Sequence, residues 1–130
     1  MIIENFFIAS DSSIDIHKNS ISLFGLIEDL QVPAIPVGQS MALPCHIIVV
    51  GRREAEVGQI RANYSLTLTG PNNSQIGDSQ AIPMVIQPNL RRNRVRVITQ
   101  IPITTAGDYR VTLFNQNGIE RSVLINITFS

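Results

Sequence analysis

The sequence predicts an all-β protein folded as a single domain over residues 1–130. The chain contains 20 Ile, 10 Val and 7 Thr against 9 Leu and 7 Ala. Side chains branched at Cβ pack well on a pleated sheet and lose rotamer freedom in a helix. Hydrophobic residues make up 44% of the chain and charged residues 15%, which excludes a disordered segment and a coiled coil. Apolar segments alternate with turn residues about every ten residues, a spacing typical of a sandwich or barrel.

The first predicted strand is Ile2 to Ala9, an apolar run that the polar cluster Ser10 to Ser13 should end. A hairpin follows, because polar and apolar residues alternate in Ser13 to His17 and again in Ser20 to Leu23. Lys18-Asn19 fits a two-residue turn between these strands.

The return strand is expected to continue through Leu30, with a bulge or a close backbone approach at Gly25. A helix over Leu23 to Leu30 is the competing interpretation. It is rejected because no capping residue precedes it and because Pro33 and Pro36 follow almost at once.

Four further strands are predicted in the middle of the chain: Ala42 to Val50, Ile60 to Thr69, Gln80 to Ile86 and Arg94 to Ile101. The Gln80 to Ile86 strand carries Pro83, which cannot donate a hydrogen bond to a neighbouring strand and therefore places this strand at a sheet edge. Residues 52–58 have local helical character, but a segment of seven residues that follows Gly51 and ends at Gly58 suits only a surface connection.

The last part of the chain predicts two strands, Tyr109 to Phe114 and Ser122 to Phe129. Asn117-Gly118 between them is the strongest short hairpin signal in the sequence. Eight or nine strands result, and no linker, repeat or low-complexity segment interrupts them.

The segment Ala106-Gly107-Asp108-Tyr109-Arg110-Val111, with the hairpin that follows it, resembles the end of immunoglobulin-like domains. The resemblance implies an antiparallel β-sandwich and a tyrosine corner, in which the Tyr109 hydroxyl bonds to nearby backbone. Gly107, Asp108, Asn117 and Gly118 are then structural residues. The chain has no Trp and a single Cys, so an antibody-type domain is excluded.

Over its whole length the chain is similar to a family of short bacterial proteins that has no assigned activity. The resemblance rests on Phe6 to Ala9, Asp11, Lys18-Asn19, Phe24 to Ile27 and Pro33 to Pro36, together with the Gly-Asp-Tyr segment. It implies an immunoglobulin-like sandwich and no particular function.

Ten basic and ten acidic residues cancel, and the sequence pI is about 6.7. No overall field therefore attracts nucleic acid or an anionic membrane, and both are disfavoured as partners. The N-terminal apolar run contains Glu4 and lacks a preceding positive region, so it does not match a secretory signal. We expect a location inside a bacterial cell, in the cytoplasm, or in a phage particle.

No catalytic residue, metal site or cofactor is predicted. Cys45 is the only cysteine and is expected to be an inert thiol in the core. His46 follows it directly in a strand and must face the other way, so the two cannot share a metal ion. Asp15 and His17 share a face beside a turn, but two ligands do not make a site. A hydrolase using His17 or His46 remains an alternative.

The feature above background is a row of arginines. Arg92, Arg94 and Arg96 fall on one face of a strand, while Val95 and Val97 face the core. Three guanidinium groups in a row can bind carboxylates or phosphates of a partner. The simpler interpretation is a charged outer face that keeps the strand soluble.

We expect a non-catalytic interaction or structural module that self-associates or binds another protein. Low charge and a mean hydropathy of +0.17 leave more apolar surface than one small core needs. Nearly continuous apolar runs, such as Ile47 to Val50, suggest burial on both faces and cover from another chain. A small-ligand or carbohydrate-binding sandwich is the first alternative, although the chain has few aromatic residues.

Overall fold

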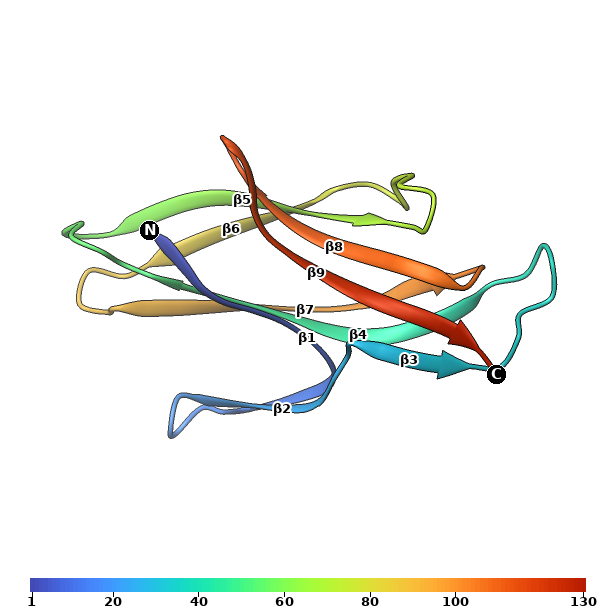
Figure 1. Ribbon diagram of the computed structural model, residues 1–130. Coiled ribbons are helices and arrows are strands. Elements are labelled where there is room, and N and C mark those ends of the chain that lie inside the picture. Colours follow the sequence, from blue (N-terminus) through green and yellow to red (C-terminus); the bar gives the residue numbers. More distant parts are fainter.

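The computed structural model describes residues 1–130 and contains nine strands and no helix. The strands form a four-stranded sheet of order β2-β1-β4-β7 and a five-stranded sheet of order β3-β9-β8-β5-β6 (Figure 1). Their bounds are β1 Ile2–Asp15, β2 Ser20–Leu26, β3 Asp29–Val32, β4 Met41–Arg52, β5 Ile60–Thr69, β6 Gln80–Ile86, β7 Arg92–Ile103, β8 Gly107–Asn115 and β9 Gly118–Phe129. The predicted all-β sandwich is therefore confirmed.

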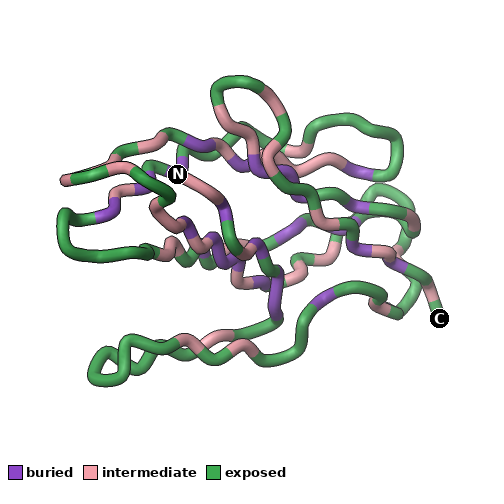
Figure 2. Tube along the Cα trace, turned by 60° about the vertical axis from the view of Figure 1, so that its left-hand side comes forward, coloured by how far each residue is buried: buried purple, intermediate pink, exposed green.

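The core lies between the two sheets and consists of 20 buried residues drawn from both. Side chains alternate between core and solvent along most strands, as in β5, where Tyr64 and Leu66 are buried and Arg61 and Asn63 are exposed. Figure 2 shows the buried residues gathered on the strands of the sandwich, while the β1–β2 hairpin is almost entirely exposed or half-buried. No part of the chain forms a helix long and apolar enough to cross a membrane.

The first strand is longer than predicted, because β1 continues to Asp15 through the polar cluster that was expected to end it. Residues 11–15 pair with β2, from Asp11 opposite Phe24 to Asp15 opposite Ser20. Polar residues are tolerated there because the outer part of this hairpin stays in water.

The hairpin turn also differs from the prediction. It spans the four residues 16–19 rather than only Lys18-Asn19, since Asp15 and Ser20 form the last pair. The Asp15 Oδ1 closes the turn by accepting hydrogen bonds from the main-chain N–H of His17 at 3.0 Å and of Lys18 at 3.1 Å. Asn19 takes a positive φ of 49°, a conformation that Asn tolerates.

The predicted continuous return strand through Leu30 is wrong, because the chain changes sheets after Leu26. β3 pairs in parallel with β9 in the other sheet, so the sandwich is not wholly antiparallel. Gly25 precedes the change with φ of 65°, and a β-carbon there would lie 2.5 Å from the Ser10 Oγ. The expected close approach at this glycine is therefore present, and it bends the strand out of the hairpin.

The C-terminal half follows the predicted order closely, with β5 and β6 at the predicted bounds and β6 at a sheet edge. In the last hairpin the two loop residues are Gln116 and Asn117, because Asn115 pairs with Gly118. Asn117-Gly118 therefore does not fill the two loop positions, because Asn117 is the second loop residue and Gly118 is the first residue of β9. The Asn115 Oδ1 accepts from the Asn117 N–H at 2.7 Å and holds the turn.

Tyr109 has the geometry of a tyrosine corner. Its side chain is buried, and its hydroxyl accepts from the N–H of Thr104 at 3.2 Å and of Thr105 at 3.3 Å. The same hydroxyl donates to the Thr105 carbonyl at 2.8 Å. Asp108 accepts from the Asn126 side chain at 2.8 Å, and Gly107 has φ of 133°, where an added β-carbon would lie 2.8 Å from the Pro71 Cβ. These contacts fix the loop that connects the two sheets.

Replacing Tyr109 by Phe is expected to lower the free energy of unfolding by about 1–3 kcal/mol, because backbone groups at residues 104 and 105 lose their partner. Tyr64→Phe is the matched control, since the Tyr64 ring is also buried but its hydroxyl makes no hydrogen bond within the protein. Urea unfolding of both variants measures the difference. Equal losses would show that the corner adds nothing.

Candidate functional site

The arginine row lies on the outer face of β7, as its spacing predicts. Arg92, Arg94 and Arg96 point away from the core, whereas Val97, the residue after Arg96, is buried. β7 is the last strand of the four-stranded sheet and pairs with β4 only. The arginines are therefore beside a free sheet edge.

Arg92 is engaged within the protein. Its Nε and Nη2 donate to the Glu4 carboxylate at 2.8 and 3.1 Å, and the Arg52 Nε lies 3.4 Å from the same carboxylate. The hydrogen bond from Arg92 lowers the pKa of Glu4, and that bond raises the pKa of Arg92. An exposed pair of this kind adds little stability. Glu4 is shared by Arg52 and Arg92, so the three side chains together keep one net positive charge.

Arg94 and Arg96 have no carboxylate within 4.0 Å. The Arg94 guanidinium donates to the Asn19 carbonyl at 3.2 Å and to the Asn19 Oδ1 at 3.4 Å. The Arg96 Nη1 donates to the Ser12 Oγ at 3.3 Å. Two positive charges on this face therefore remain without an ion-pair partner.

These contacts hold the β1–β2 hairpin against the outer face of the sheet. Figure 1 shows the hairpin on the side of the four-stranded sheet that faces away from β5 and β8. Ile21 of the hairpin and Val50 of β4 line one crevice between the two layers. Ile48, which points outward from β4, is only 1% exposed. The predicted burial of this run on both faces is present for Ile47, Ile48 and Val49, and the chain's own hairpin lies on the outer side of the strand.

His46 lies beneath the same hairpin. Its Nδ1 is 2.7 Å from the Ser12 Oγ, and its Nε2 is 3.7 Å from the Asp11 Oδ1. A histidine between a hydroxyl and a carboxylate is the combination used in nucleophilic catalysis. None of the larger cavities includes any of these three residues, and Arg96 already bonds to the hydroxyl. The contacts connect the hairpin to the sheet.

The other candidate ligands and nucleophiles are far from His46 or turned away from it. Cys45 is fully buried on the opposite side of β4, and burial raises the pKa of its thiol to about 11. Asp15 accepts main-chain hydrogen bonds in the turn that carries His17. No three His, Cys, Asp or Glu side chains come together as a metal site would require.

The free edge of β7 can be located from its ladder. Arg53 N–H donates to the Arg91 carbonyl at 2.9 Å, just beyond the pair of Arg52 with Arg92. Hydrogen-bonded pairs recur at every second residue of an antiparallel ladder. The odd-numbered residues of β7 therefore bond to β4, and the main-chain groups of the even-numbered residues point away from the sheet.

Both ends of this edge are blocked. The Arg94 N–H donates to the Asn93 Oδ1 at 2.9 Å, and the Asn93 amide donates to the Val85 carbonyl of β6 at 2.6 Å. Pro102 at the other end has no N–H. Arg96, Ile98 and Gln100 between them keep unpaired N–H and C=O groups, and the Ile98 side chain is 63% exposed.

The remaining sheet edges carry features that oppose pairing with another chain. β6 contains Pro83, whose position shares the outward orientation of Val85, so its missing N–H costs no ladder bond. β3 has only four residues, and Gly25 with its positive φ interrupts β2. The middle of β7 has no such feature except the arginines on its outer face.

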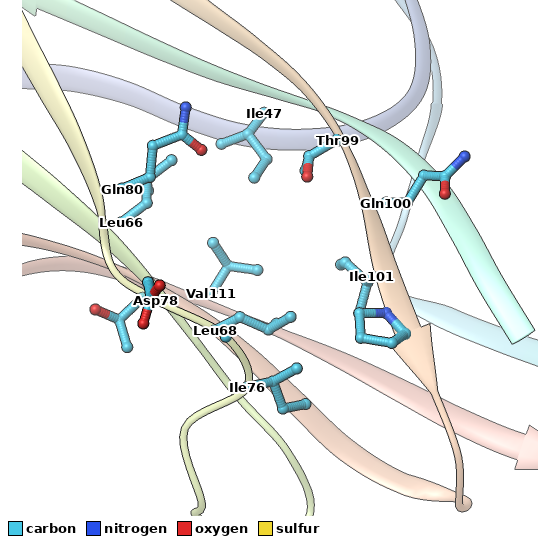
Figure 3. A pocket seen from close by; sticks show the side chains of 13 residues that line it. Ile47, Leu66, Leu68, Ile76, Asp78, Gln80, Thr99, Gln100, Ile101 and Val111 are labelled. Atoms are coloured by element: carbon cyan, nitrogen blue, oxygen red, sulfur yellow. The ribbon is translucent and has the colours of Figure 1, made fainter. Parts of the chain in front are cut away.

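A cleft of about 220 Å³ opens between the sheets where β6 and β7 diverge. Figure 3 shows Ile47, Leu66, Leu68, Ile101 and Val111 around its open middle, with the Thr99 hydroxyl directed into it. The cleft was not predicted from the sequence.

Comparison of the chain with models of protein families, with curated proteins and with solved structures found no match. The geometry described above therefore carries the functional argument alone.

Cys45 is expected to react with a thiol reagent about 100-fold more slowly at pH 8 in the folded protein than in denaturant. A pKa near 11 instead of 9.0 lowers the thiolate fraction by about two powers of ten, and burial adds a steric barrier. The rate of modification, followed with and without urea, measures this. Similar rates in both conditions would show an accessible thiol.

Proposed function

We propose that the protein is a non-catalytic interaction module that self-associates by pairing the free edge of β7 with the same edge of a second copy. One observation carries the proposal: Arg96, Ile98 and Gln100 present unpaired main-chain groups in the middle of a twelve-residue strand. An exposed edge of this kind is a template for another strand. The tyrosine corner at Tyr109 supports an immunoglobulin-like architecture.

The unpaired residues are symmetric about Ile98, which suits a two-fold axis. Antiparallel pairing about this residue places Ile98 opposite Ile98 of the partner subunit and Arg96 opposite Gln100 of the partner subunit. Each hydrogen-bonded pair contributes two bonds, so about six main-chain hydrogen bonds would form. The exposed Ile98 side chains would contact each other on the outer face and leave water.

The arginine row helps to select this register. Moving the axis two positions toward the start of the strand would place Arg96 opposite Arg96 of the partner subunit, and like charges directly opposite each other are destabilising. With the axis at Ile98, the uncompensated charges of Arg94 and Arg96 lie apart from those of the second copy. Arg92 contributes less, because its guanidinium is hydrogen-bonded to the Glu4 carboxylate.

The alternatives have less support from the geometry. The cleft between the sheets has no aromatic lining residue on which a sugar ring could stack. Hydrolysis through His46 would need a substrate cavity beside Ser12, where the hairpin instead packs on the sheet. Self-association through a sheet edge requires neither an aromatic lining nor a substrate cavity.

We expect the protein to sediment as a dimer at tens of micromolar and the Ile98→Lys variant to sediment as a monomer. Lysine at the centre of the edge would place two positive charges opposite each other on the two-fold axis. Leu124→Lys is the matched control, because Leu124 is an exposed strand residue on the outer face of the other sheet. It should remain dimeric.

A monomeric wild-type protein, or equal dissociation of both lysine variants, would contradict the proposal. Amide hydrogen exchange tests the main-chain pairing directly. The N–H groups of Arg96, Ile98 and Gln100 should exchange more slowly as the protein concentration rises, whereas exposed amides in the 70–79 loop should not change.

A further inference from the structure

The cleft between β6 and β7 has a size that suits one small organic molecule. Its volume of about 220 Å³ equals that of about seven water molecules in the liquid. This is below the roughly 300 Å³ at which sites for drug-sized ligands begin. The floor is apolar and comes from both sheets, with Ile47 and Ile101 from one and Leu66 and Val111 from the other (Figure 3).

Polar side chains without partners surround this floor. Thr99, Asp78 and Gln80 line the cleft, and none of the three makes a side-chain hydrogen bond within the protein. Thr99 is half-buried, and Asp78 and Gln80 are exposed. An apolar cavity with a few available polar groups is the usual composition of a ligand site.

Asp78 gives the cleft a negative charge. It is the only charged residue among those that line the cleft, and no basic group lies within 4.0 Å of it. In the loop around it, the Gln75 amide donates to the Gly77 carbonyl at 3.0 Å and to the Ser79 Oγ at 3.4 Å. Ser79 in turn bonds to the Thr67 hydroxyl of β5 at 2.8 Å. Asp78 itself is exposed, so its carboxylate is open to solvent beside the cleft.

We propose that this cleft binds a small aliphatic ammonium compound, with the apolar body on the floor and the ammonium group at Asp78. A carboxylate beside an apolar surface matches a cation with a hydrocarbon chain and repels anions. Branched chains of about five carbon atoms match the volume and the lining of Ile, Leu and Val. The binding uses the inner side of β7, whereas the proposed self-association uses its edge.

Titration with 3-methylbutylammonium, followed by the methyl resonances of Leu68, Ile76 and Val111, tests the proposal. The isosteric alcohol 3-methylbutan-1-ol lacks the charge and should bind about three- to fivefold more weakly, the range for a partly exposed ionic contact. In Asp78→Asn this preference should disappear, while both compounds still bind. Asp29→Asn is the matched control, because it removes an exposed carboxylate from β3, which does not line the cleft. This variant should still bind the amine more tightly than the alcohol.

Equal affinities of the amine and the alcohol for the wild-type protein would overturn the role of Asp78. Resonance shifts spread over the surface instead of the cleft would overturn the site itself. The Ile98→Lys variant separates this proposal from self-association, because it should remain able to bind the amine as a monomer. Loss of binding in that variant, with its fold intact, would also contradict a site on the inner side of β7.

Discussion

The main-chain ladder of β4 is the interaction on which the rest of the sandwich depends. β4 pairs with β1 on one side and, along all twelve of its residues, with β7 on the other. Over residues 46–52 both edges are paired, so this part of the strand can be buried on both faces without unpaired main-chain groups. Ile47 and Val49 enter the core, and Ile48, which points to the other side, is also buried. β7 is therefore the strand that carries the long unpaired edge of the sheet. The arginine row and the cleft both lie along β7.

Local sequence pattern was sufficient for the strands whose surroundings are simple. β5 and β6 begin and end as predicted, because alternation and flanking turn residues act over a few neighbouring positions. The segment from Ser10 to Leu30 was predicted poorly. Alternation shows which residues share a face, but it does not show which sheet a strand joins. The change of sheets after Leu26 depends on β9, almost one hundred residues later in the chain.

The candidate site was predictable to the same limited degree. The two-residue period placed Arg92, Arg94 and Arg96 on one face, and this is where they lie. Their contacts were not predictable, because Glu4, Asn19 and Ser12 are 88, 75 and 84 residues away in the chain. Asp78 gave no signal either. It stands in a loop rich in Gly, Asn and Ser, where no periodicity assigns a direction to a side chain.

The parallel pairing of β3 with β9 has a consequence for how the chain reaches its folded form. β8 and β9 are neighbours in sequence, so their hairpin can form quickly from local contacts. β3 must wait for that hairpin, although it is made early during synthesis, and its Leu30 and Val32 stay unpaired until the last strand has left the ribosome. The pairing of β3 with β9 is therefore a late event that joins residues far apart in the sequence. The rate of folding should be set by this encounter.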